Sequence, residues 1–178
     1  MGGNVLGAGN RPPVGFVLNL LERTEGKEMA TEYIFTKFFH ILIAILALGT
    51  SAGLGILLEL YGDHPTHGAY VLGAIKRLVT FFVIPGYLLM LATGLWMVHL
   101  SWPLKTTWIL AALALWGIGL LALTISQWVL TKQLRLFETS GPGSSSYRRT
   151  SLLGRVLGAG TGLLVIAILY LMVFKPGT

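Results

Sequence analysis

The residues of this sequence best suited to chemistry are two histidines, His40 and His99, which lie inside long uncharged apolar segments. An ionisable side chain in a membrane span is costly and is by default a candidate functional residue. Neutral imidazole is a common axial ligand of haem iron, and helical bundles often hold such cofactors. We therefore expect a cofactor site for haem b, with His40 as the principal ligand and His99 as its partner. In the alternative interpretation, each histidine only bonds a carbonyl, a headgroup or water near the membrane surface.

The depth of the two histidines follows from the helices that carry them. His40 lies near the start of one apolar segment and His99 near the end of the next, so antiparallel helices place both near the same interface. Directly packed helices lie about 8–10 Å apart, which is too close for a porphyrin between two ligands. Both histidines can bind one haem only if these helices are diagonal or splayed. The face of His40 continues in a groove of small residues, namely Ala44, Ala47, Ser51 and Gly55.

An Asp-His-x-x-His grouping lies between the first two apolar segments. Asp63, His64 and His67 could hold a divalent metal ion, but they stand in a segment rich in glycine and proline. A metal site needs a further ligand and a rigid scaffold, and neither is evident here. A solvated polar turn is the preferred interpretation, and no metal site is predicted.

A second polar cluster gathers at the ends of the apolar segments, on the side opposite the two histidines. We expect Glu59 to pair with Arg77 or Arg155 and so to connect helix ends. A path for protons or anions is the alternative interpretation. The other polar members of this cluster are Lys76, Gln127 and Lys132.

The elements that position these residues are membrane helices. Of 178 residues, 54% are hydrophobic and 11% are charged, against roughly 25% charged in soluble domains. A helix needs about 20 apolar residues to cross the hydrocarbon core. The sequence predicts an all-α integral membrane bundle of four transmembrane helices in a domain of residues 29–178. The expected spans cover about residues 34–60, 74–101, 106–131 and 152–174.

The first 28 residues differ from the rest of the chain. They are rich in glycine and proline, and their apolar stretch from Val14 to Leu21 is too short to span a membrane. No small-residue cleavage site follows it, so a signal peptide is not expected. We expect residues 1–28 to be a flexible extension without a role in the fold, with Met29 as an alternative start. A segment that lies on the membrane surface is the other interpretation.

Basic residues indicate the orientation in the membrane. Side A denotes the side that holds both ends of the predicted domain, and side B the opposite side. From Met29 on, three lysines lie on side A, namely Lys37, Lys105 and Lys175, against seven basic residues on side B, namely Lys76, Arg77, Lys132, Arg135, Arg148, Arg149 and Arg155. Arg23 and Lys27 reduce this contrast if residues 1–28 belong to the protein. Lysine and arginine favour the cytoplasmic side. We therefore expect a multi-pass plasma-membrane protein with both termini extracytoplasmic. The net charge of +6 is then explained by anionic headgroups, and no nucleic-acid binding is expected.

Small residues on two spans indicate close helix packing. The first span carries Gly49 and Gly53, and the fourth carries Gly154, Gly158 and Gly162 at intervals of four residues. Such faces let backbones approach within a bundle, or between chains in a homo-oligomer or a larger membrane complex. In the second span, Pro85 followed by a glycine should kink the helix.

Searches for catalytic motifs find none. There are no cysteines, which excludes disulfides, thiolate metal sites and cysteine nucleophiles. No phosphate-binding loop, serine nucleophile elbow or zinc-protease motif is present. The catalytic residues are therefore unknown, and an enzyme of this composition would be a membrane oxidoreductase.

From Phe38 to Pro176 the chain resembles an uncharacterised bacterial family of predicted four-helix integral membrane proteins, a domain of unknown function. The matching motifs are Lys37-Phe38-Phe39-His40, Thr93-Gly94-Leu95-Trp96, Trp108, Tyr147-Arg148-Arg149 and Leu171-Met172-Val173-Phe174-Lys175-Pro176. The resemblance covers about four-fifths of the chain and implies the bundle without an activity.

A more distant likeness concerns His40 and the small residues that follow it. This pattern is similar to haem-binding membrane protoporphyrinogen oxidases and to copper-resistance membrane domains. The likeness implies His40 as a haem ligand. Those oxidases also use a lysine deep in a later helix, and no lysine here occupies such a place, since Lys105 lies in a predicted loop. The oxidase activity is therefore not expected.

Three hypotheses follow from different classes of protein. The first is a haem-b-binding redox or haem-handling protein. The second is a structural or assembly subunit of a larger membrane complex, bound through its glycine faces. The third is a small transporter, which requires an inward polar stripe. The spans offer few residues for such a stripe, namely Thr80, Thr93, Thr124, Ser126 and Gln127.

Overall fold

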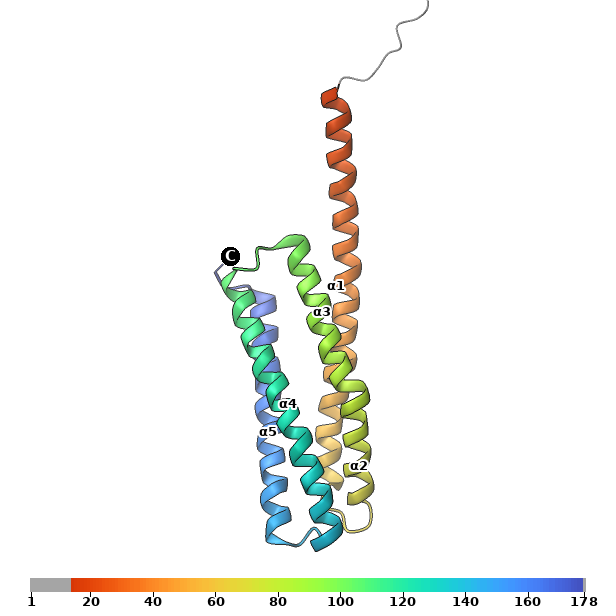
Figure 1. Cartoon of the computed structure of the whole chain (residues 1–178), viewed down its shortest axis with the longest axis vertical. Coiled ribbons are helices and arrows are strands. Elements are labelled where there is room, and N and C mark those ends of the chain that lie inside the picture. Colours follow the sequence, from red (N-terminus) through yellow and green to blue (C-terminus); the bar gives the residue numbers. More distant parts are fainter. Residues whose placement is uncertain (1–13, 178) are drawn as a thin grey trace, which may run out of the picture.

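The described chain is mostly helical, because lipid offers no partner for free backbone N–H and C=O groups. The computed structural model describes residues 14–177. Its elements are α1 (Val14–Tyr61), α2 (Gly68–Leu78), the π-helical segment η1 (Val79–Val83), α3 (Ile84–Ser101), α4 (Thr107–Ser140) and α5 (Ser145–Phe174). Four helical segments among these residues are long and apolar enough to cross a membrane, namely Arg23–Tyr61, Gly68–Ser101, Thr107–Ser140 and Ser145–Phe174. The predicted all-α bundle of four transmembrane helices is confirmed (Figure 1).

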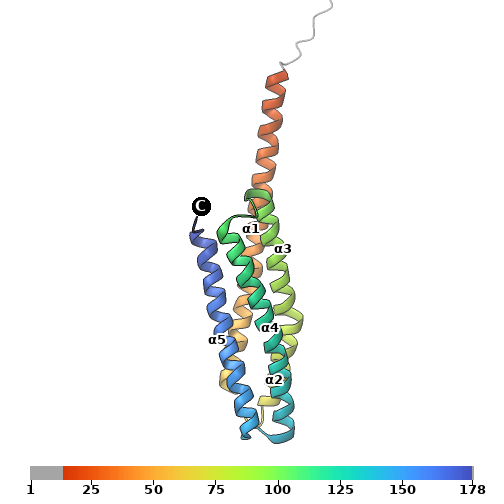
Figure 2. The same ribbon diagram turned by 60° about the vertical axis from the view of Figure 1, so that its left-hand side comes forward.

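α1 is much longer than its predicted span. It has 48 residues, which at 1.5 Å per residue gives about 70 Å, more than twice the ~30 Å hydrocarbon core. Its first part therefore projects beyond the other helices on side A (Figure 1, Figure 2). Residues 14–28, which we expected to form a separate extension, continue α1 because no proline occurs between Pro13 and Pro65. The rest of that extension, residues 1–13, lies outside the described residues.

The second span changes its helical form next to Pro85. Proline lacks an N–H group and cannot bond the carbonyl one turn earlier. The preceding residues Val79–Val83 form a π-helical turn, which is one way for a membrane helix to accommodate such a defect. The Thr80 hydroxyl also donates to the carbonyl of Lys76 at 2.9 Å. The expected interruption thus appears as a π-helical turn, and α2 and α3 are inclined to each other in Figure 1.

The spans pack as two antiparallel pairs, α1 with α3 and α4 with α5, while α2 lies against α4 (Figure 1, Figure 2). Small residues bring the first pair together. A Cβ atom added to Gly86 would lie only 2.8 Å from the Cβ of Ala47. Close backbone approach of this kind is a usual basis of helix association in lipid.

The main core lies at side B, where α1, α2, α4 and α5 meet. Tyr147 is fully buried there, and its hydroxyl donates to the carbonyl of Gly62 at 2.6 Å. The same hydroxyl accepts from Nε2 of the buried Gln133 at 3.1 Å. These bonds connect the end of α1 to α4 and α5. The apolar residues buried in this cluster are Leu54, Val71, Leu72, Ile75, Val83 and Leu130.

Candidate functional site

His40 lies between α1 and α3, in the half of the bundle nearer side A. Its side chain is buried, with 9% of the residue surface exposed. Its Nδ1 atom lies 2.8 Å from Oγ1 of Thr93 on α3. A Cβ atom added to Gly94 would lie 3.3 Å from Cε1 of His40, so this glycine makes room for the ring. His40 therefore has a defined position between two directly packed helices.

The Thr93 hydroxyl determines which ring nitrogen carries the proton. Its Oγ1 lies 2.8 Å from the carbonyl of Leu89 and 3.2 Å from that of Met90. Threonine in a helix commonly donates its single proton to such a carbonyl. Oγ1 then accepts from His40, which places the imidazole proton on Nδ1. The backbone of Met90 is a further hydrogen-bond partner of the ring, and in this tautomer Nε2 keeps its lone pair. Metal-ligating histidines have this arrangement, with one nitrogen oriented and the other free.

The first two sequence motifs of the family resemblance meet at this site. His40 closes the first motif, while Thr93, Gly94 and Trp96 belong to the second. Thr93 and Gly94 contact the His40 ring. Trp96 donates from Nε1 to Oε1 of Glu32 on α1 at 3.1 Å. The second motif therefore serves to hold α3 against α1. From the sequence, Thr93 was a polar span residue and part of a family motif but not a predicted site residue; the depth argument used for the histidines would have placed it near His40.

His99 does not lie beside His40. It is exposed, and its ring lies against Trp96 with centroids 5.7 Å apart. His40 is level with Thr93 and Gly94, and His99 is five residues further along α3, which corresponds to about 7–8 Å. Val98, the residue before His99, is buried. Because successive residues of a helix point in different directions, His99 does not share that buried face. The structure thus brings Thr93, and not His99, to the His40 ring.

At side B, Arg155 of α5 connects to the end of α1. Its Nε lies 3.1 Å from Oε2 of Glu59, and its Nη2 lies 3.0 Å from Oδ2 of Asp63. The pairing of Glu59 with Arg155 was one of the two predicted from the sequence, and it is confirmed. Ser151 also donates to Oδ1 of Asp63, at 3.5 Å. These contacts connect helix ends, as expected.

The loop histidines form a turn. Nδ1 of His64 accepts from the backbone N–H groups of Thr66 and His67, at 3.3 Å in both cases. The rings of His64 and His67 stack with centroids 4.8 Å apart. Asp63 is directed to Arg155 and not to these rings. No group of three or more metal-ligating side chains is found in the described part of the chain.

A further buried contact joins α3 and α4, and no motif in the sequence indicated it. Tyr87 stacks on Trp116 with ring centroids 5.0 Å apart, and its hydroxyl donates to the Trp116 carbonyl at 3.0 Å. Gly119 leaves space for that hydroxyl, because a Cβ atom there would collide with it. The indole N–H groups of Trp108 and Trp116 are buried and have no acceptor among the described residues. Aromatic residues in spans commonly only pack, so their types alone did not indicate this contact.

The fold and these buried contacts define an integral membrane protein with four transmembrane spans. Over residues 34–176 the chain matches the family described as predicted integral membrane protein (DUF2269), and it belongs to that family. No curated protein and no solved structure matches the chain. The family resemblance seen in the sequence is therefore confirmed, and the family description names no activity.

Proposed function

We propose that this protein binds haem b in the membrane through His40, as a redox or haem-handling protein. The orientation of His40 supports this function. The imidazole is buried in a span, its Nδ1 lies 2.8 Å from Oγ1 of Thr93, and its Nε2 carries the lone pair that would bind iron. Axial histidines are tuned by such partners. When bound, haem b supplies one-electron chemistry. The chain supplies the ligand, its orientation and a surrounding of low dielectric constant.

The proposed site takes one histidine from this chain. α1 and α3 touch at Gly86 and again beside His40 at Gly94, so a porphyrin does not fit directly between these two helices. His99 is exposed and lies further toward side A. Of the two histidines, His40 would therefore hold the haem from this chain, and His99 would not act as its partner.

A visible spectrum tests this function. The full-length protein is expressed with an ample supply of haem, purified in detergent and measured before and after reduction with dithionite. The wild type and His99→Ala should show a Soret band and sharp reduced bands, which His40→Ala should lose. Thr93→Val should keep haem but shift the bands, because the ring loses its orienting partner. A flat spectrum for the wild type, or equal loss in both histidine variants, would contradict the proposal.

For the location we propose the plasma membrane, with side B in the cytoplasm and both termini outside. The first part of α1 and the end of α5 lie on the same side of the bundle (Figure 1), and basic residues are more numerous on the other. Reporters fused after Thr178 test this orientation. Alkaline phosphatase should be active there and green fluorescent protein dark, and the reverse result would invert the orientation.

A second candidate function, a subunit of a homo-oligomer or a larger membrane complex, is favoured by the open glycine faces. Gly154 packs on Val129 of α4, with 3.6 Å between an added Cβ atom and Cγ1. An added Cβ atom would meet nothing within 4 Å at the remaining glycines of these faces, namely Gly49, Gly53, Gly158 and Gly162. Co-purification of further subunits in a mild detergent, or a homo-oligomer by mass, would support this function. A monomer without partners would contradict it.

A further inference from the structure

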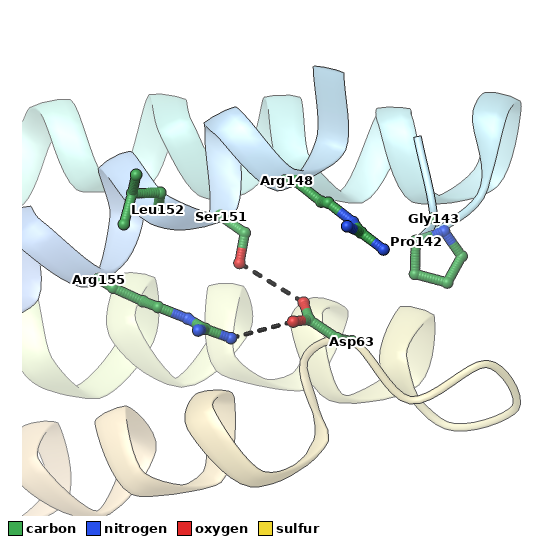
Figure 3. A pocket seen from close by; sticks show the side chains of 7 residues that line it. All are labelled: Asp63, Pro142, Gly143, Arg148, Ser151, Leu152 and Arg155. Carbon is green, nitrogen blue, oxygen red and sulfur yellow. Dashed lines mark hydrogen bonds and ion pairs between the residues drawn. The ribbon is translucent and has the colours of Figure 1, made fainter. Parts of the chain in front are cut away.

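An open polar pocket of about 480 Å³ lies at side B, between the loop after α1 and the beginning of α5. It is separate from the His40 site, which lies toward side A. The residues that line it are Asp63, Pro142, Gly143, Arg148, Ser151, Leu152 and Arg155 (Figure 3). Its volume is in the range of small-molecule sites in proteins.

The charges around this pocket are unevenly paired. Arg155 contacts two carboxylates, those of Glu59 and Asp63, so this group of three keeps one excess negative charge. The side chain of Arg148 is exposed and makes no ion pair or hydrogen bond with a described residue, whereas its backbone N–H donates to the carbonyl of Ser144 at 3.0 Å. Figure 3 shows its guanidinium group beside Pro142, with no bond drawn to Asp63. Within the lining, Arg148 therefore supplies a guanidinium group without an ion pair, and Asp63 supplies a carboxylate that also contacts Arg155; Glu59 lies outside the lining.

The positive charge of Arg148 is reinforced by α5. Arg148 lies in the first turn of this 30-residue helix, after the N-cap residue Ser144, whose hydroxyl accepts from the N–H of Tyr147. A helix N-terminus carries a partial positive charge. Guanidinium is also suited to bind phosphate oxygens in a bidentate manner.

The pocket lies where the membrane surface should be. Leu152, on its rim, is 63% exposed and begins the apolar part of α5. Pro142 and Gly143 belong to the loop between α4 and α5. A ligand in this pocket would therefore have apolar helix on one side and polar loop on the other, as a phospholipid headgroup does.

We propose that this pocket binds a headgroup that contains both a phosphate and a primary ammonium group, the phosphoethanolamine group of a phospholipid. The phosphate contacts Arg148, and the ammonium group contacts Oδ1 of Asp63, which accepts a long bond of 3.5 Å from Ser151, while Oδ2 stays paired with Arg155 at 3.0 Å. A phosphatidylglycerol headgroup lacks the cation, and the quaternary ammonium of phosphatidylcholine cannot donate a hydrogen bond. Arg148 and Asp63 together therefore select between lipids that share the same phosphate.

Native mass spectrometry of the full-length protein in detergent tests this site. Phosphatidylethanolamine, phosphatidylglycerol and phosphatidylcholine are added in equal amounts, and bound lipids are counted by mass. The wild type should retain phosphatidylethanolamine preferentially. Arg148→Gln should bind it roughly tenfold or more weakly, since a charged hydrogen bond is lost, and Arg148→Lys should recover part of the binding. The matched control is Arg149→Gln, which removes an exposed arginine outside the pocket lining and should bind as the wild type does.

Two further measurements test which lipid the pocket prefers and whether it binds a membrane lipid or a free headgroup. Asp63→Asn should keep binding but lose the preference for phosphatidylethanolamine over phosphatidylglycerol. Glycerophosphoethanolamine, which lacks acyl chains, should displace the lipid if the free headgroup suffices; if it does not, the ligand is the membrane lipid. Equal retention of the three lipids by the wild type would overturn the proposal. So would equal losses in Arg148→Gln and Arg149→Gln, or an unchanged preference in Asp63→Asn.

Discussion

The side-B and side-A halves of this bundle differ in how their buried polar groups are paired. At side B, the Tyr147 hydroxyl has both a donor and an acceptor partner, and four helices converge on it. In the half toward side A, His40 uses one ring nitrogen, and the indole N–H groups of Trp108 and Trp116 have no acceptor among the described residues. The buried apolar cluster there contains only Val98, Trp108 and Ile109, against seven residues at side B.

This difference indicates a division of roles. A half that satisfies its polar groups and buries its largest side chains determines the fold. A half that leaves buried donors and a lone pair unused calls for an explanation, since such groups are costly, and the haem site that we propose gives one for His40. Ligand-binding regions are commonly drawn from the less stable parts of a protein. The proposed haem site and the structural core thus occupy opposite ends of one bundle.

The largest expected effect is the loss of Tyr147. Tyr147→Ala should lower the free energy of unfolding by about 3–5 kcal/mol, because it removes a fully buried aromatic ring. Unfolding can be followed by circular dichroism as sodium dodecyl sulfate is titrated into detergent micelles. The control is Tyr170→Ala on the same helix, where 56% of the residue is exposed and the change should be small.

The same variants also test the comparison between the side-A and side-B halves of the bundle. If Tyr147→Ala and Tyr170→Ala unfold alike, side B is not the structural core. If instead Tyr147→Ala unfolds easily while His40→Ala leaves the free energy of unfolding nearly unchanged, the division into a structural half and a functional half is supported.

A smaller effect is expected for glycines that differ only in their surroundings. Gly86→Ala should destabilise the protein by about 1–3 kcal/mol, because the new Cβ would lie 2.8 Å from the Cβ of Ala47 and the helices must separate. Gly53→Ala meets nothing within 4 Å and should stabilise α1 by about 0.4–1 kcal/mol through the unfolded state. Both are measured by the same titration. A loss of stability or of oligomeric mass in Gly53→Ala would show instead that a partner covers this face.

Much of the fold could be predicted from the sequence because membrane insertion is a local property. Each apolar run satisfies its backbone internally, so the four spans were predictable without knowledge of their neighbours. His40 could be singled out for the same reason, as a costly polar group in an apolar run. The contact between Glu59 and Arg155 was predictable because both side chains lie at span ends on one side.

The contacts that these residues make depend on how each helix is rotated and shifted against its neighbour. The sequence of a single helix does not specify that arrangement. Thr93 faces His40 because Gly86 lets α1 and α3 approach at Ala47, and that register is a property of the pair. The same depth argument placed His99 near His40, but His99 is exposed on another face of α3. Tyr147 suits a membrane interface by type, and its burial follows only from the convergence of α1, α4 and α5.

The smallest expected effect concerns the charged contacts of Arg155 at side B. The side chain is 39% exposed, and exposed ion pairs contribute about 0.2–1 kcal/mol each. Arg155→Gln should therefore lower the free energy of unfolding far less than Tyr147→Ala. The difference from the wild type should also shrink between 0.1 and 1 M salt, as the screening length falls from about 10 to about 3 Å. Arg149→Gln, which lies outside this cluster, should show neither effect. If Arg155→Gln instead costs as much as Tyr147→Ala at all salt concentrations, the ion pairs stabilise side B as much as the tyrosine does, and the assignment of the core to Tyr147 alone fails.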